Sequence, residues 1–372
     1  MRFAIVGCGV IGPLHARTIA GLGSRAELVA TVDVREDVAG ALAARYGARP
    51  FSSLTDALAR HDIDTVAVCV PSGRHVDIAC QALAAGLNVI VEKPVDVSDE
   101  AADRLARAER EAPGTVTVIS QHRFDPASQV VHDAVADGRF GTVTSGLASI
   151  ALWRSQRYYD SGDWRGTWAL DGGGALMNQG VHQIDLLVWM LGRPVQVHAT
   201  TGLLAHERVE VEDTGVATIR FENGALAVVH GTTAAYPGIA NRVQVHGSRG
   251  SAVIDDDMLA FFHAAGENGD APDYGAGTSS DQSDRVLPGR GAHDPVTGQV
   301  DAHTRQYVDF LDAVEAGRRP LVTVAQARRT LAVVTSIYAS ARTGRTVDVP
   351  LIDDQASGEQ APGDRSTDDT EV

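Results

Sequence analysis

Two segments of the chain hold side chains that could move a proton at a bound substrate. Lys93, in Val91-Glu92-Lys93-Pro94, follows a short apolar run, and an ammonium group there can stabilise negative charge on a substrate oxygen. Asn178, His182 and Asp185 are four and three residues apart, so a helix would place all three on one face. His182 then suits a general base and Asn178 a hydrogen-bonding partner of the substrate. The spacing also fits, and by itself favours, a core histidine bonded to Asp185.

A glycine turn near the start of the chain predicts a site for a dinucleotide. Gly7, Gly9 and Gly12 stand between a short apolar run and an alanine-rich run, the order of a strand, a turn and a helix. In that context Gly7 permits the tight turn, Gly9 lets the backbone approach a pyrophosphate, and Gly12 lets the helix pack closely. Asp33 ends the next apolar run, where a carboxylate can hold the hydroxyls of the adenosine ribose. We favour this interpretation over a plain turn with a solvated aspartate.

Further candidates for cofactor contacts follow other apolar runs. In Val70-Pro71-Ser72-Gly73-Arg74-His75, Ser72 is placed to cap the next helix, and capping is compatible with a contact to the cofactor. Glu92 and Lys93 end another run, although a Glu-Lys pair at a strand end is also typical of solvated surface. Pro94 restricts Lys93 to an extended conformation and is a candidate for a cis peptide bond. The predicted cofactor-binding residues are Gly7, Gly9, Val10, Ile11, Gly12, Asp33, Val70, Pro71, Ser72, His75, Glu92, Lys93 and Gln121.

Asp33 also bears on the choice between NAD and NADP. Its carboxylate would repel the 2′-phosphate of NADP, so an aspartate at this position favours NAD. Arg35 follows two residues later and could offset that repulsion. We therefore expect NAD as the cofactor, with NADP as the alternative.

The segment 153–168 is rich in aromatic and basic side chains. Its Trp and Tyr rings could stack on sugar or nucleobase rings, while Arg154, Arg157 and Arg165 could bind a carboxylate or phosphate. Loops of this composition also serve only to cover a core. The sequence alone does not separate these two uses.

Composition and charge exclude several classes of protein. The chain has 372 residues, of which 44% are hydrophobic, and a formal net charge of −16. This charge argues against nucleic acid or an anionic membrane surface as a partner, and no apolar run approaches the roughly 20 residues that span a bilayer. Cys8, Cys69 and Cys80 show neither paired nor metal-ligand spacing, and we expect no metal site. Reduced cysteines and an opening run that suits a core strand rather than a signal peptide predict a cytoplasmic protein.

From residue 1 to 122 the pattern predicts alternating strands and helices. Strands are expected at 2–7, 27–33, 65–70, 88–91 and 115–120, and helices at 13–22, 36–46, 53–60, 74–85 and 98–112. The strands are apolar throughout, as in a parallel sheet that helices cover on both faces. Right-handed crossovers would bring their carboxyl ends to one edge, where ligands bind in such folds. We predict an NAD(P)-binding Rossmann domain over 1–122.

After residue 122 the pattern changes to that of an α+β domain with a large, mostly antiparallel open sheet. Strands are predicted at 142–152, 195–204, 214–221, 224–233, 241–247 and 251–255, and helices at 126–137, 174–191, 302–316 and 325–342. The polar stretch 264–300 reads as a long loop. We predict a substrate-binding and oligomerisation domain over 123–350 and a disordered acidic tail over 351–372.

Several of these segments together resemble one known family. The chain is similar to the Gfo/Idh/MocA oxidoreductases in its glycine turn, Glu92-Lys93-Pro94, Gln121-His122-Arg123-Phe124, and Gly172-Gly173-Gly174 through His182 to Asp185. The likeness runs from residue 1 to about 350. It implies a Rossmann domain and an open-sheet domain that packs against its mate in homodimers or homotetramers. The implied activity is NAD(P)-dependent oxidation of a secondary alcohol on a sugar, nucleotide-sugar or cyclitol.

The resemblance also implies roles for single residues. Lys93 looks like the lysine that contacts the reacting hydroxyl, and His182 looks like the acid/base residue, so both are predicted to be catalytic. Inositol dehydrogenases often have Asp where this chain has Asn178, and Asn cannot balance the charge of an imidazolium. The segment 164–182 resembles dehydrogenases of nucleotide-linked N-acetyl-hexosaminuronic acids, and it also occurs in other sugar dehydrogenases. The predicted substrate contacts are Lys93, Arg123, Trp153, Arg165, Asn178, His182 and Tyr236.

Two other functions compete with this one. The first is a dehydrogenase of a free monosaccharide, an anhydrosugar or an inositol. The second is a dinucleotide-binding sensor without catalysis, which the fold alone does not exclude. The presence of both Lys93 and His182 speaks against a sensor, because a sensor needs no base.

Overall fold

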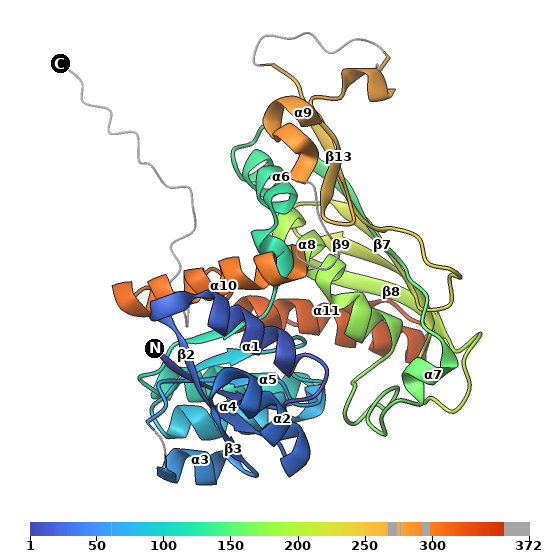
Figure 1. Ribbon diagram of the computed structural model, residues 1–372. Helices are drawn as coiled ribbons and strands as arrows, with labels where there is room; N and C mark the ends of the chain where they lie inside the picture. The colour runs from blue at the N-terminus through green and yellow to red at the C-terminus, as the bar shows by residue number, and fades with distance from the viewer. Residues whose placement is uncertain (61, 267–273, 276, 292–297, 353–372) are drawn as a thin grey trace, which may run out of the picture.

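The computed structural model describes residues 1–60, 62–266, 274–275, 277–291 and 298–352 (Figure 1). A six-stranded parallel sheet has the order β3-β2-β1-β4-β5-β6. Its strands are β1 (Arg2–Val6), β2 (Glu27–Val32), β3 (Arg49–Phe51), β4 (Thr65–Val68), β5 (Asn88–Val91) and β6 (Val116–Val118). The connecting helices are α1 (Gly12–Gly21), α2 (Glu36–Tyr46), α3 (Leu54–Arg60), α4 (His75–Ala84) and α5 (Asp99–Glu111). The Rossmann-like sheet is therefore confirmed.

Both faces of this sheet are covered because its strands are apolar throughout. In β1, Phe3 and Ile5 belong to one hydrophobic cluster, and Ala4 and Val6 belong to another on the opposite face. The Phe3 side also packs against α10 (Gly298–Ala316), which lies along α1. Since all six strands run in parallel, their carboxyl ends share one edge, and the glycine turn and Lys93 lie there.

The second sheet has eight strands in the order β13-β12-β11-β7-β10-β9-β8-β14. Every neighbouring pair is antiparallel except β7 with β10, so the prediction of a mostly antiparallel sheet is confirmed. The strands are β7 (Val143–Ala151), β8 (Pro194–Gly202), β9 (Thr214–Phe221), β10 (Leu226–Thr232), β11 (Asn241–Gly247), β12 (Gly250–Asp255), β13 (Met258–Ala264) and β14 (Val347–Asp348). The helices are α6 (Pro126–Ala136), α7 (Gln156–Tyr159), α8 (Val181–Leu191), α9 (Ser283–Val286), α10 and α11 (Val324–Thr343).

Helix α11 joins the two parts of the molecule. It packs against β8 and α8 on one side and against α5 and β6 on the other, and Figure 1 shows it between the two sheets. A capping box at Thr323 fixes its start, and the Val322 carbonyl just before it accepts a hydrogen bond from Thr117 Oγ1 in β6. This packing sets the carboxyl edge of the parallel sheet against α8.

Several elements differ from the sequence prediction. The single helix expected at 174–191 is a short π-helical segment, Ala175–Gln179, followed by α8. Strands β3, β13 and β14 were not predicted, because each is short or lacks alternating polarity. The predicted loop 264–300 contains α9 and the start of α10.

Some predictions concern residues that the structure does not describe. Of the tail predicted at 351–372, residues 353–372 lie outside the described residues, as do 267–273, 276 and 292–297 of the predicted loop. The domain limits 1–122 and 123–350 stay a prediction. In the part of the chain that is described, none of the helices combines the length and apolar character needed to cross a membrane.

Candidate active site

The glycine turn between β1 and α1 offers an open surface on which a dinucleotide could lie. Gly7 has φ +98°, and a Cβ built on it would lie 2.4 Å from the carbonyl carbon of Cys69. A Cβ on Gly12 would lie 2.4 Å from the carbonyl oxygen of Gly7, whereas a Cβ on Gly9 meets nothing within 4 Å. Val10 is 83% exposed. The turn thus has the tight corner, the close helix and the open backbone expected of a pyrophosphate site.

Asp33 lies at the end of β2 beside this turn. One of its carboxylate oxygens accepts a hydrogen bond from the backbone N–H of Cys8 at 2.9 Å, and the other accepts one from that of Arg35 at 3.0 Å. The Arg35 side chain is 66% exposed, and its Nε lies 3.9 Å from the carboxylate. The sequence therefore places a carboxylate and a solvated guanidinium together where a ribose would be recognised.

Lys93 follows β5 at the same edge and reaches toward the second part of the molecule. Its Nζ donates hydrogen bonds to the backbone oxygen of Asn178 at 2.8 Å and to the Asn178 side-chain oxygen at 3.3 Å. The peptide bond from Lys93 to Pro94 is cis. Burial, partly offset by the nearby Glu92 and Asp171 carboxylates, lowers the pKa of the Lys93 ammonium from its usual value.

Asn178 lies in the π-helical segment before α8, and its amide is held at both ends. Its Nδ2 donates a hydrogen bond to Asp171 Oδ1 at 2.6 Å, while its Oδ1 faces Lys93. The turn that precedes this segment requires a glycine at position 174, because a Cβ there would lie 1.6 Å from the backbone oxygen of Glu212. The buried Glu212 carboxylate accepts hydrogen bonds from the backbone N–H groups of Gly174 and Leu176 and so closes the turn.

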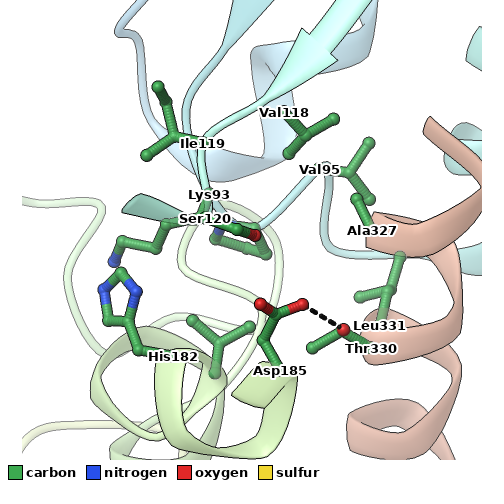
Figure 2. A pocket seen from close by; sticks show the side chains of 12 residues that line it. Lys93, Val95, Val118, Ile119, Ser120, His182, Asp185, Ala327, Thr330 and Leu331 are labelled. Carbon is green, nitrogen blue, oxygen red and sulfur yellow. Dashed lines mark hydrogen bonds between the residues drawn. The ribbon is translucent and has the colours of Figure 1, made fainter. Parts of the chain in front are cut away.

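His182 stands one turn further along, near the start of α8. Figure 2 shows its ring beside the end of the Lys93 side chain. The ring also packs edge to face against His122, with centroids 4.9 Å apart and an interplanar angle of 78°. Burial, followed by the positive charges of Lys93 and His122, lowers the pKa of His182 well below its usual value. The imidazole is therefore neutral at neutral pH and able to accept a proton.

The predicted common face of Asn178, His182 and Asp185 is only partly correct. Asp185 is hydrogen-bonded to Thr330 and turns away from the His182 ring (Figure 2). It also accepts two hydrogen bonds from Arg123, both of 2.7 Å. The alternative interpretation of a core histidine bonded to Asp185 is therefore wrong, since Asp185 pairs with an arginine instead.

Arg123, predicted to bind substrate, is a buried structural residue. Only 2% of it is exposed, and beyond its pair with Asp185 it donates a hydrogen bond to Gln326 in α11. Its guanidinium is also stacked over the ring of Trp189, 5.3 Å from the centroid. These contacts correct the sequence prediction: Arg123 is buried beneath the site, where it ties α8 to α11.

Glu92 is likewise buried beneath the site rather than exposed to a cofactor. One carboxylate oxygen accepts a hydrogen bond from His15 Nε2 at 2.8 Å, and the other accepts one from the Lys93 backbone N–H at 3.0 Å. The hydrogen bonds and charges of His15 and His303 outweigh burial and keep the pKa of Glu92 well below its usual value. Tyr307 lies 2.6 Å from the other ring nitrogen of His15. This network fixes the backbone from which Lys93 projects.

The remaining residues predicted to contact the cofactor lie at the same edge of the sheet, but they differ in burial and in the hydrogen bonds that they already form. Ser72 is buried and does not cap α4, so the capping interpretation is wrong. The two ring nitrogens of His75 lie 2.7 and 2.9 Å from the carbonyl oxygens of Pro94 and Val70, which makes His75 a support for this loop. Gln121 is 3% exposed, and among the described residues its side-chain oxygen has no hydrogen-bond partner. Val70, Pro71 and Ile11 are half-buried.

The aromatic and basic loop borders Asn178. Arg165 donates a hydrogen bond to the Tyr158 hydroxyl at 2.7 Å, and Gln179, the neighbour of Asn178, donates another at 3.1 Å. The Arg165 guanidinium lies over the rings of Tyr158 and Trp164, at 4.2 and 4.4 Å from their centroids. Arg165 is thus placed beside the site, with both an aromatic surface and a positive charge.

Trp153 and Tyr236 form a separate exposed pair. Their rings pack edge to face with centroids 5.2 Å apart, and Tyr236 is 77% exposed. Trp153 also forms an isolated bridge with Ala234 at the end of β10. Neither residue lines the small cleft under Lys93 and His182, whose walls come from the ends of β5 and β6 and from α8 and α11.

Two clusters of possible metal ligands form in the structure although the sequence shows no ligand spacing. The groups are His15, Glu92 and His303, and His122, Asp125 and Asp257, each with donor atoms within 4.8 Å of one another. Their shortest nitrogen–oxygen distances are both 2.8 Å, the length of an ordinary hydrogen bond. We therefore interpret both as hydrogen-bonded clusters that support the site.

Sequence reasoning missed three residues of the site. Asp171 holds the amide of Asn178, and Asp257 and Asp125 hold His122. An acidic residue directly before Gly172 was the only local signal for Asp171. Nothing in the sequence near Asp257 indicates a contact with residue 122, because the β12–β13 turn brings the two together.

Comparisons with known proteins agree with this geometry. Residues 1–120 match the oxidoreductase family with an NAD-binding Rossmann fold, and residues 128–253 match the GFO/IDH/MocA C-terminal domain. Inositol 2-dehydrogenase of Rhizobium meliloti is 28% identical over 72% of this chain and 80% of its own length. The uncharacterised oxidoreductase YrbE of Bacillus subtilis is 30% identical over 68% of this chain and 73% of its own length.

Among solved structures, the WlbA dehydrogenase of Bordetella pertussis in complex with NADH and UDP-GlcNAcA has a TM-score of 0.85. It is 33% identical and covers 94% of this chain and 98% of its own. The two matches to family domains span more than half of the chain and follow its two sheets in order. This chain therefore belongs to the Gfo/Idh/MocA family of oxidoreductases, with an NAD-binding Rossmann domain at its N-terminal side.

Proposed function

We propose that this protein is an NAD-dependent dehydrogenase that oxidises a secondary alcohol on a sugar carrying an anionic group, such as a nucleotide-linked uronic acid. The observation that carries the proposal is the contact of Lys93 Nζ with Asn178 beside the neutral ring of His182. A cation, an oriented amide and a free base meet there at the carboxyl edge of a dinucleotide-binding sheet.

The residues at this edge fit NAD. The open backbone at Gly9 and Val10 would face the pyrophosphate, and the Asp33 carboxylate would hold the adenosine ribose. The buried side-chain oxygen of Gln121 has no partner among the described residues and could accept a hydrogen bond from a carboxamide. When bound, NAD supplies the acceptor for the hydride that leaves the substrate carbon.

The chain itself handles the proton and the charge on oxygen. His182 Nδ1 or Nε2 accepts the proton of the substrate hydroxyl as its carbon loses hydride, and the ring becomes an imidazolium. Lys93 Nζ donates a hydrogen bond to the same oxygen and stabilises the negative charge that develops on it. Asn178, held by Asp171, keeps the ammonium in place. In the reverse direction His182 returns the proton.

The charge around the site favours an anionic substrate. Arg165 and Arg154 both add positive charge at Lys93 and so contribute to the lowered pKa of its ammonium. Neither forms an ion pair with a carboxylate among the described residues, although Arg165 stacks on Tyr158 and Trp164. Unpaired guanidinium groups beside aromatic rings suit a phosphate or carboxylate attached to a sugar or base. The solved WlbA relative was crystallised with UDP-GlcNAcA, a ligand of that class.

The choice of NAD over NADP is part of the proposal. Two backbone N–H groups hold the Asp33 carboxylate in place beside the glycine turn. Arg35 is solvated and lies at 3.9 Å from that carboxylate. A carboxylate fixed at this position would repel the 2′-phosphate of NADP, which supports a preference for NAD.

We also propose a homodimer or homotetramer formed through the second sheet. Helices α8 and α11 pack against this sheet, while Val216, Leu226 and Val228 on β9 and β10 are 41–56% exposed. The alternating pattern of burial directs these three apolar side chains to the other face of the sheet, where they lie among Thr218, Arg220 and His230. Light scattering after gel filtration would determine the mass, and a monomer at micromolar concentration would contradict this part.

The enzymatic proposal is tested by following reduced-nicotinamide absorbance with NAD and NADP over a substrate panel. The panel pairs UDP-N-acetylglucosaminuronic acid with neutral UDP-N-acetylglucosamine, free glucuronate, glucose, myo-inositol and levoglucosan. We expect turnover on the nucleotide-linked uronic acid with NAD. Turnover only on a neutral sugar or cyclitol would favour the competing dehydrogenase function, and NADH binding without any turnover would favour a sensor.

A pair of variants tests the anionic substrate directly. Arg165→Gln removes the guanidinium beside Tyr158, whereas Arg157→Gln removes an exposed one from the same loop. We expect Arg165→Gln to raise KM for the anionic substrate about tenfold or more, in keeping with the loss of a charged hydrogen bond. Equal effects of the two substitutions would show that only the general charge of the loop matters.

A further inference from the structure

The base His182 is packed against a second histidine whose position depends on two distant segments. His122 lies in the short helical turn Gln121–Phe124 that follows β6. Its Nδ1 is 3.0 Å from Asp125 Oδ2 and 2.8 Å from Asp257 Oδ1, and 19% of its side chain is exposed. The two carboxylates therefore hold the ring from one edge.

Asp257 comes from the turn between β12 and β13, far along the chain. Asp256 and Asp257 have φ of 43° and 65°, a left-handed conformation that aspartate tolerates better than most residues. Asp256 exchanges hydrogen bonds with the backbone of Asn241, with its Oδ1 accepting one at 2.8 Å. The hairpin is thus anchored by one aspartate and directs the next one at His122.

Asp125 is fixed independently. It is 2% exposed, and its other carboxylate oxygen accepts a hydrogen bond from Arg305 in α10 at 3.0 Å. The Arg305 Nε also donates to the backbone oxygen of Phe124 at 2.7 Å. The His122 ring is therefore held by Asp257 from the β12–β13 turn and by Asp125, which Arg305 of α10 holds in turn.

We propose that His122, clamped by Asp125 and Asp257, is a positioning residue for the catalytic base: its ring packs against His182 and fixes the orientation of that ring, and the two carboxylates set the charge beside it. The inference rests on the proposed function, in which His182 accepts the hydroxyl proton. His122 itself is assigned no contact with substrate.

The electrostatics of the cluster fit this role. Burial opposes a charge on His122, but Asp257 and Asp125 together outweigh it and raise the pKa of His122 to about 10. The charged and titratable groups that act on His182 are Lys93 and His122, which disfavour its imidazolium, Glu92, which favours it, and His303 on α10, which disfavours it. His122 is thus one of two fixed cations that keep the base free of a proton in neutral solution.

The test measures the pKa of His182 directly, without a substrate. Protein labelled with ¹³C-histidine is titrated by NMR, and the His182 signals are assigned from their loss in His182→Gln. The variants are His122→Gln and Asp257→Asn, with Asp256→Asn as the matched control in the same turn. Asn is suited to the left-handed conformation at both turn positions, and thermal melts together with NADH binding confirm that each variant is folded.

We expect His122→Gln to raise the pKa of His182 by about one unit, the usual effect of removing one close like charge. Asp257→Asn should shift it in the same direction by less, because His122 then loses its own proton more easily, and Asp256→Asn should leave it unchanged. The pH below which kcat/KM falls should rise most in His122→Gln, less in Asp257→Asn and not at all in Asp256→Asn.

An unchanged pKa of His182 in both His122→Gln and Asp257→Asn would overturn the inference, as would an equal shift in Asp256→Asn. The titration also separates this inference from the proposed function. A shifted pKa with no turnover on any substrate of the panel would support the clamp and contradict the dehydrogenase. Turnover with an unshifted pKa would do the opposite.

Discussion

Asp171 and Asn178 are joined by a hydrogen bond of 2.6 Å, and this bond decides which way the Asn178 amide points. Because Nδ2 of Asn178 donates to Asp171, its Oδ1 lies on the other side, 3.3 Å from Lys93 Nζ. The Asp171 carboxylate thus lies one hydrogen bond beyond the amide that faces Lys93. Asp171 also accepts a hydrogen bond from the Gly166 backbone, so it joins the aromatic loop to the site.

Asp171→Asn should lower kcat about tenfold to a hundredfold, because the Asn178 amide can then reverse and remove the side-chain acceptor that orients Lys93 Nζ. NADH affinity should change little, since Asp171 lies away from the glycine turn. Steady-state kinetics and NADH fluorescence titration measure the two effects. Asp163→Asn, an exposed acid in the same loop, serves as the control, and equal losses in both variants would contradict the role of Asp171.

His182→Ala should reduce kcat by about 10² to 10⁴, the usual contribution of a general base, while NADH affinity stays close to that of the wild type. Lys93→Ala should reduce kcat comparably and also weaken NADH binding, because Lys93 stands between the cofactor edge and Asn178. Stopped-flow turnover and fluorescence titration distinguish the two. The exposed His198→Ala should leave both quantities unchanged. Near-normal turnover in His182→Ala and Lys93→Ala would refute the mechanism.

The local parts of the site could be predicted from the sequence, and the long-range parts could not. The form of the glycine turn is a local feature, since Gly12 packs against the Gly7 carbonyl of the same turn, and the structure confirms it; the contact of Gly7 with Cys69, by contrast, depends on the neighbouring strand. Arg123 was misassigned because a charged residue after a strand looks available, and only the fold shows Asp185 and Gln326 around it. Asp257 reaches His122 through an edge hairpin whose second strand carries no alternating pattern.

The pH dependence of oxidation follows from the lowered pKa of His182. A base must be unprotonated, so kcat/KM should stay level from neutral pH down through about 6.5, the usual value for histidine, and fall only below it. The same shift makes folding less favourable in that acidic range, because the unfolded chain binds the proton more readily. A pH profile at constant ionic strength measures the first effect. An acid limb at or above the usual histidine value would contradict the assignment of His182 as the base.

Asp33→Ser should raise the ratio of kcat/KM for NADP to that for NAD by about tenfold or more, because it removes the charge that repels a 2′-phosphate and leaves Arg35 in place. The change also leaves the Cys8 N–H without its present acceptor, so a loss of about 1–3 kcal/mol in stability is expected beside it. Thermal melts separate this loss from the kinetics. The exposed Asp37→Ser is the control, and an unchanged cofactor ratio in Asp33→Ser would show that the ribose is recognised elsewhere.

The buried pair of Arg123 and Asp185 provides a test that separates a structural role from substrate binding. Both residues are less than 5% exposed and share two hydrogen bonds of 2.7 Å. Asp185→Asn leaves a buried guanidinium without its counter-ion, which should cost about 3–5 kcal/mol in the free energy of unfolding. Asp255→Asn breaks the more exposed pair with Arg242 and should cost less than about 1 kcal/mol.

Urea unfolding of the two variants measures this difference, and kinetics complete the test. If Arg123 ties α8 to α11, the loss appears in stability, and KM for the substrate stays near that of the wild type in the Asp185→Asn protein that remains folded. A raised KM with unchanged stability would instead return Arg123 to the substrate site. The expected result would also explain why a charge lies beneath the active-site helix: it holds α8, and therefore His182, at a fixed distance from α11.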